Sequence, residues 1–94
     1  DYGRVEMAAC FVEWVELMTE LEHPVPEVYG LLQRALGYLE AHAPDRRALL
    51  HFEKELARAL GLYEAGRPGA EALFQTAHRF PATRAGLLER WKDG

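Results

Sequence analysis

Apolar side chains in residues 4–22 recur every three or four positions, which is the spacing of one face of an α-helix. The centre of this face is formed by Met7, Phe11, Trp14, Met18 and Leu21. It is widened by Val5, Ala8, Val12 and Val15, while the opposite side carries Glu6, Glu13, Glu16 and Glu20. An apolar arc this wide predicts a helix that contacts more than one neighbour and keeps its acidic side in solvent.

Prolines divide the rest of the chain into further helices. The segment His23-Pro24-Val25-Pro26 predicts a helix end, because the residue before a proline is disfavoured in the α region. A second helix is predicted over 26–42, with these residues facing inward: Val28, Leu31, Leu32, Ala35, Leu36 and Leu39. Because glycine weakens a helix interior, Gly30 and Gly37 suggest that a neighbouring helix passes close by.

A third helix is predicted over 45–60. Asp45 is placed to cap its start, and Gly61 is placed to end it in the left-handed conformation. Its core face consists of Leu49, Phe52, Leu56 and Leu60. Two short helices follow over 70–78 and 82–91, and no segment shows the alternation of a strand. The sequence therefore predicts an all-α fold, a small bundle of three main helices plus one or two short C-terminal ones.

The length of 94 residues fits a single helical domain, and the start at Asp1 rather than Met suggests a processed protein or an excised fragment. One cysteine, Cys10, permits no internal disulfide, which fits a reducing compartment such as the cytoplasm. No apolar run approaches the ~20 residues of a membrane span.

Few residue patterns support catalysis or metal binding. A single Glu-x-x-His pair, Glu20 with His23, lacks the second pair that a di-iron bundle needs. The chain has no serine, and Cys10 lies inside the first helix, where a buried, inert thiol is expected. The sequence thus predicts neither an enzyme, a cofactor nor a metal site. The aromatic residues Trp14, Tyr29, Tyr38 and Phe52 are predicted to lie in the core.

Charge is divided unevenly along the chain, whose formal net charge is −4. Residues 1–45 contain nine acidic and two basic groups, and residues 46–94 contain six acidic and nine basic ones. Within the third helix, four basic groups fall on one side at spacings of four, three and four: Arg47, His51, Lys54 and Arg58. We call these four residues the basic row.

The basic row has two interpretations at this stage: a solvated helix face, or a binding surface for an anionic partner. Glu53 and Glu55 lie at spacings that leave the row largely unpaired within its own helix. An anionic partner would be an acidic peptide or, as the alternative, the phosphates of a nucleic acid. A structural or dimerising bundle with no ligand is a third interpretation.

Three ordered segments resemble the C-terminal helical region of RecO, the bacterial recombination mediator. They are Ala8-Ala9-Cys10-Phe11-Val12-Glu13, then Pro26-Glu27-Val28-Tyr29-Gly30-Leu31-Leu32 with Ala35, Leu36 and Leu39, then Phe52-Glu53 with Leu56, Leu60 and Gly61. The agreement in order and spacing extends over residues 5–62. The four-cysteine zinc module of many family members is absent, and so is the N-terminal oligonucleotide-binding barrel. The resemblance therefore implies that the chain is a C-terminal fragment excised from a longer protein.

The resemblance implies a non-enzymatic role in DNA repair and recombination. RecO-like proteins anneal complementary strands and help to load the recombinase onto DNA coated by single-strand DNA-binding protein. Their helical region is similar to a docking platform for the acidic, Phe-ending tail of that coating protein, and a basic residue of the family maps onto His51. A RecR-like partner, contact with DNA mainly through an absent N-terminal domain, and a cytoplasmic, nucleoid-associated location are further implications.

Overall fold

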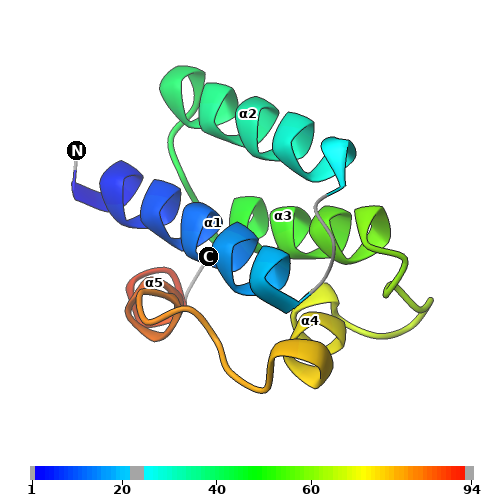
Figure 1. Ribbon diagram of the computed structural model, residues 1–94. Helices are drawn as coiled ribbons and strands as arrows, with labels where there is room; N and C mark the ends of the chain where they lie inside the picture. The colour runs from blue at the N-terminus through cyan, green and yellow to red at the C-terminus, as the bar shows by residue number, and fades with distance from the viewer. Residues whose placement is uncertain (1, 22–24, 93–94) are drawn as a thin grey trace.

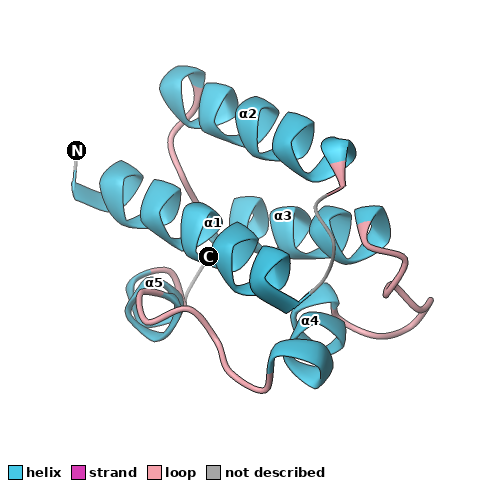
Figure 2. Ribbon diagram, viewed as in Figure 1, coloured by secondary structure: helices cyan, strands magenta, loops and turns pink. Residues whose placement is uncertain are grey.

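The computed structural model describes residues 2–21 and 25–92, with the side chain of residue 21 excepted, and contains five helices and no strand in that part of the chain (Figure 2). The helices are α1 (Tyr2–Leu21), α2 (Pro26–Ala41), α3 (Arg46–Ala59), α4 (Gly69–Ala77) and α5 (Arg84–Arg90). The all-α prediction, with three main helices and two short ones, is confirmed. The predicted helix end at His23-Pro24 lies outside the described residues.

Helix α1 is the centre of the arrangement. It contacts each of the other four helices, with α2 and α3 on one side and the two short helices on the other (Figure 1). Its wide apolar arc therefore serves several neighbours, as the sequence predicted. Met7, Trp14 and Met18 are fully buried, and Phe11 is nearly so.

Helix α2 lies at the edge of the bundle and packs only along one side, against α1 and α3. Val28 and Leu39 are buried there, whereas Tyr29 and Tyr38 are 50% and 44% exposed. Their prediction as core residues was wrong, because helical spacing does not show that the element is covered on one side only. Val5, near the start of α1, is also exposed rather than buried with the apolar face.

The ends of α3 follow the predicted local chemistry. The backbone N–H of Ala48 donates to Oδ1 of Asp45 at 2.9 Å, so Asp45 is the N-cap of the helix. After the helix, Gly61 has a φ of 75°, the left-handed conformation that glycine adopts without strain. Both predictions are confirmed.

Helix α4 begins in direct contact with the backbone of α3. A Cβ atom added at Gly69 would lie 2.5 Å from the Cα of Lys54, so only glycine fits there. The close approach expected at Gly30 and Gly37 does not occur. A Cβ at Gly37 would meet nothing within 4 Å, and one at Gly30 would meet only the side chain of Arg34 in the same helix, at 3.4 Å.

The acidic side of α1 is only partly in solvent, contrary to the sequence prediction. The carboxylate of Glu13 accepts hydrogen bonds from the backbone N–H of Ala82 at 3.0 Å and the hydroxyl of Thr83 at 2.8 Å. Glu6 pairs with Arg90 at 2.8 Å. These two carboxylates hold the C-terminal segment against α1, which explains why an acidic side lies beside α5.

A buried ion pair joins α3 to the same segment. Glu53 is fully buried, accepts a hydrogen bond from Nε1 of Trp14 at 2.9 Å, and pairs with the guanidinium of Arg84, whose Nη2 lies 3.1 Å from Oε1.

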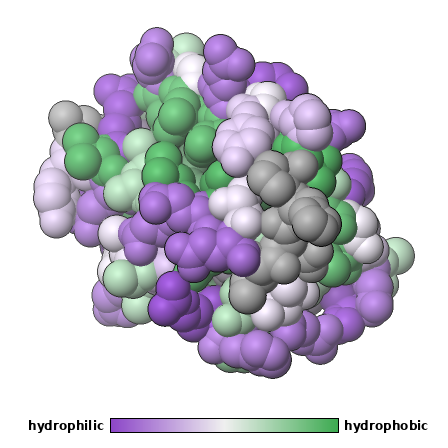
Figure 3. All heavy atoms as spheres, viewed as in Figure 1, coloured by the Kyte–Doolittle hydropathy of each residue, from purple (hydrophilic) through white to green (hydrophobic). Residues whose placement is uncertain are grey.

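Figure 3 shows the outer surface, where hydrophilic side chains surround a smaller apolar area over α1 and α2. In the described part of the chain, no helix is long and apolar enough to cross a membrane.

Candidate partner-binding groove

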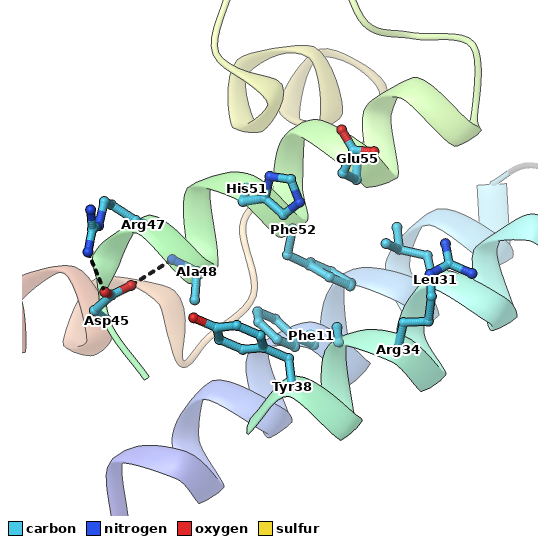
Figure 4. A pocket seen from close by; sticks show the side chains of 11 residues that line it. Phe11, Leu31, Arg34, Tyr38, Asp45, Arg47, Ala48, His51, Phe52 and Glu55 are labelled. Atoms are coloured by element: carbon cyan, nitrogen blue, oxygen red, sulfur yellow. Dashed lines mark hydrogen bonds and ion pairs between the residues drawn. The ribbon is translucent and has the colours of Figure 1, made fainter. Parts of the chain in front are cut away.

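An open groove of about 540 Å³ lies between α2 and α3, with one side chain of α1 at its base (Figure 4). The aromatic rings of Phe11 and Phe52 form its floor and stack with centroids 4.1 Å apart and an interplanar angle of 16°. Leu31 and Ala35 of α2 and Ala48 of α3 extend the apolar lining. A floor of this kind fits an aromatic or large aliphatic side chain of a ligand.

One end of the groove carries the guanidinium of Arg47, which forms an ion pair with a carboxylate of its own helix cap. Nη2 of Arg47 lies 3.4 Å from Oδ2 of Asp45, the same carboxylate that caps α3. The side chain of Arg47 is 89% exposed, so this pair is weak and a stronger anion can displace it.

The other end of the groove carries Arg34, beside Leu31 in Figure 4. Arg34 forms no ion pair within the described part of the chain. The guanidinium of Arg34 lies along its own helix, with Nη1 3.4 Å from where a Cβ of residue 30 would be. Arg34 is therefore a cation placed beside an apolar floor and available to a ligand.

The structure divides the basic row into two parts. Arg47 and His51 line the groove. Lys54 and Arg58 do not, and lie instead over the ring of Tyr63, with the Lys54 amine 5.6 Å and the Arg58 guanidinium 5.0 Å from its centroid.

The expectation that the row is largely unpaired near its own helix was wrong for two members. Arg58 donates to Glu55 at 2.9 Å across an i,i+3 spacing, and Arg47 pairs with the cap residue Asp45. The sequence argument discounted a pair between Glu55 and Arg58 because few pairs in this helix have the favourable i,i+4 spacing. On a helix, side chains three positions apart are also neighbours.

Arg34, Tyr38 and Phe11 are groove residues that the sequence argument did not select. Phe11 was predicted as a core residue, which it also is, and Arg34 lies on a different helix from the basic row. Tyr38 stacks on His42 with ring centroids 4.3 Å apart. The spacing of four between Arg34 and Tyr38 was the available signal, since it places a cation and an aromatic ring on one side of α2.

Other candidate sites offer less. The thiol of Cys10 is buried, and desolvation raises its pKa to about 12, so it is not a nucleophile at neutral pH. Among the described residues, no three His, Cys, Asp or Glu side chains gather as a metal site requires. A second hollow of about 320 Å³ beside α1 has acidic walls, including Glu16 and Glu20, which would repel an acidic peptide.

The fold and the groove together define a small all-α domain with an open, apolar-floored surface site. Comparison with known families identifies the domain further: the model described as "Recombination protein O C terminal" matches residues 1–64. The chain belongs to this family of RecO C-terminal domains, as the resemblance in its three helical segments indicated.

A curated relative agrees with this assignment. The chain is 34% identical over 89 residues to the DNA repair protein RecO of Pelobacter propionicus, an alignment that covers 95% of this chain and 35% of the relative. The chain thus spans about a third of the length of that protein. No solved structure matches the chain.

Proposed function

We propose that this chain is a non-catalytic protein-interaction domain of a RecO-like DNA repair protein, and that its groove docks an acidic peptide tail such as that of single-strand DNA-binding protein. The observation that supports this most is the stacked floor of Phe11 and Phe52 with a guanidinium at each end. A peptide ending in an aromatic residue carries a ring next to a free carboxylate. The ring suits the floor, and the carboxylate suits an arginine, whose planar fork donates two parallel hydrogen bonds.

The groove suits a weak, reversible interaction. Burial of a Phe side chain contributes about 1.5–3 kcal/mol, and a hydrogen bond to a charged group about 1.5–3 kcal/mol. The sum, about 3–6 kcal/mol, corresponds to a Kd no tighter than tens of micromolar.

Direct contact with nucleic acid is the second candidate function. Lys54 and Arg58 lie together over Tyr63, outside the groove, and such a patch can contact phosphates. Two cations neutralise few phosphates, however, and the whole chain has a net charge of −4. Binding to single-stranded DNA that weakens steeply as salt is raised would favour this second function.

Calorimetric titration with an acidic peptide ending in Phe tests the first proposal. We expect the double variant Arg34→Glu/Arg47→Glu to bind at least roughly tenfold more weakly than wild type, because loss of the one charged hydrogen bond counted above removes about 1.5–3 kcal/mol. Arg46→Glu is the matched control, because Arg46 is exposed on the first turn of α3 but does not line the groove. Equal affinity of wild type and the double variant would refute the proposal, as would an unchanged affinity when the terminal Phe of the peptide is replaced by Ala.

A further inference from the structure

The walls of the groove carry as much negative as positive charge. Arg34 and Arg47 face the carboxylates of Asp45 and Glu55, so the lining is neutral when His51 is uncharged. A site for an acidic ligand gains nothing from a carboxylate on its wall unless that carboxylate has another role. Asp45 has one, because it caps α3.

Glu55 caps no helix. It lies in the middle of α3, where no backbone N–H needs a cap, and the structure gives its carboxylate one partner among the described residues, Arg58 at 2.9 Å. Arg58 itself lies outside the groove lining, over the ring of Tyr63. Glu55 therefore places a carboxylate on the wall of the groove, and the partner of that carboxylate, Arg58, lies outside the lining.

We propose that Glu55 is a specificity-determining residue of the groove. This inference rests on the proposed function. The negative charge of Glu55 keeps acidic residues of the ligand away from the middle of α3. The groove therefore takes one carboxylate, next to an aromatic side chain, at an end that carries an arginine. Arg58 is then a positioning residue that restrains and partly neutralises Glu55, and it does not contact the ligand.

Two possible roles of Arg58 predict different results in a double-mutant cycle. If Arg58 acts only through Glu55, then Arg58→Gln weakens peptide binding in the wild-type background and has no effect once Glu55 is Gln. If Arg58 binds the peptide directly, then Arg58→Gln weakens binding by the same factor in both backgrounds.

The experiment is calorimetric titration of wild type, Glu55→Gln, Arg58→Gln and the double variant with the same acidic, Phe-ending peptide. We expect Glu55→Gln to bind roughly three- to tenfold more tightly, because one like charge near the ligand carboxylate is removed. The double variant should bind as tightly as Glu55→Gln. Glu64→Gln is the matched control, because Glu64 pairs with Arg67 at the same spacing and distance, 2.9 Å, away from the groove.

The outcomes separate this inference from the proposal on which it rests. Binding by wild type with unchanged affinity in Glu55→Gln refutes the role of Glu55 alone. An equal loss on Arg58→Gln in both backgrounds refutes the positioning role of Arg58. No binding by the wild-type domain, with native helical circular dichroism, refutes both the proposed function and this inference.

Discussion

Replacement of Arg84 by Met tests how strongly the buried ion pair holds the C-terminal segment to the bundle. Glu53 is fully buried, and its carboxylate has two partners, the guanidinium of Arg84 and the indole N–H of Trp14. In Arg84→Met the charge of Glu53 stays in the interior with only the indole as a donor. The side chain of Met has a similar length, so the main change is the loss of the counter-charge.

The expected loss is large relative to the whole stability of the domain. Removing one partner of a buried pair costs about 3–5 kcal/mol, because it leaves an uncompensated charge in the interior. A domain of this size is stable by about 5–14 kcal/mol in total. For a chain of this length, 1 kcal/mol lowers the Tm by about 4–8 °C, so the Tm of Arg84→Met should fall by at least about 12 °C.

Urea denaturation followed by helical circular dichroism measures the loss of stability. Arg90→Met is the matched control, because it breaks the Glu6–Arg90 pair, whose side chains are 19% and 41% exposed, and should cost less than about 1 kcal/mol. Arg84 also lies over the ring of Phe80, and this contact is lost in every variant at position 84. The double variant Glu53→Met/Arg84→Met therefore removes the stranded charge, and it leaves the indole N–H of Trp14 without its acceptor.

The double variant should be more stable than Arg84→Met, because it no longer buries an unpaired carboxylate. If Arg84→Met costs no more than Arg90→Met, the carboxylate of Glu53 does not depend on Arg84 and the reasoning is wrong. It is also wrong if the double variant is less stable than Arg84→Met.

The remaining predictions concern the glycines and the cysteine. Gly37→Ala should stabilise the domain by up to about 1 kcal/mol, because this exposed position in α2 has open space. Gly69→Ala should destabilise it by about 1–3 kcal/mol or more, because the added methyl group would clash with the backbone at Lys54. Urea denaturation of both variants checks these opposite signs. Cys10 should not react with a thiol reagent in the folded state, as a colorimetric thiol assay would show. Folding raises the pKa of Cys10 from 9.0 to about 12, so between these two values the thiol ionises in the unfolded chain but not in the folded one. The contribution of Cys10 to the free energy of unfolding should therefore be constant below pH 9 and fall by about 1.4 kcal/mol per pH unit above it. Unfolding measured at pH 8 and pH 10 should show this loss in wild type and not in Cys10→Ala.

The features that were predictable from the sequence depend on neighbours along the chain. The positions of the helices follow from apolar spacing and prolines, and the ends of α3 follow from Asp45 and Gly61, whose effects reach only a few residues. Glu53 shows where this reasoning ends. Its partner Arg84 is 31 residues away, and no helical pattern within α3 distinguishes a buried glutamate from an exposed one.

The candidate site was predictable only in part for the same reason. Helical spacing placed Arg47 and His51 on one side of α3, and both line the groove. The spacing could not show that α2 lies opposite their end of the row, nor that Arg34 comes from that helix. The other end of the row, at Lys54 and Arg58, faces Tyr63 instead, because the chain turns back after α3.

The floor of the groove belongs to the core, and this shapes how its function can be tested. Phe11 and Phe52 are each only 2% exposed, and they connect α1 to α3 while they form the surface that a ligand ring would contact. Such a floor is already ordered before a ligand arrives, so binding pays mainly for ordering the peptide. Replacing either ring with Ala would cost about 3–5 kcal/mol of stability and would confuse folding with binding. Substitutions at the exposed rim, at Arg34, Arg47 and Glu55, change the charge of the groove and leave that floor in place.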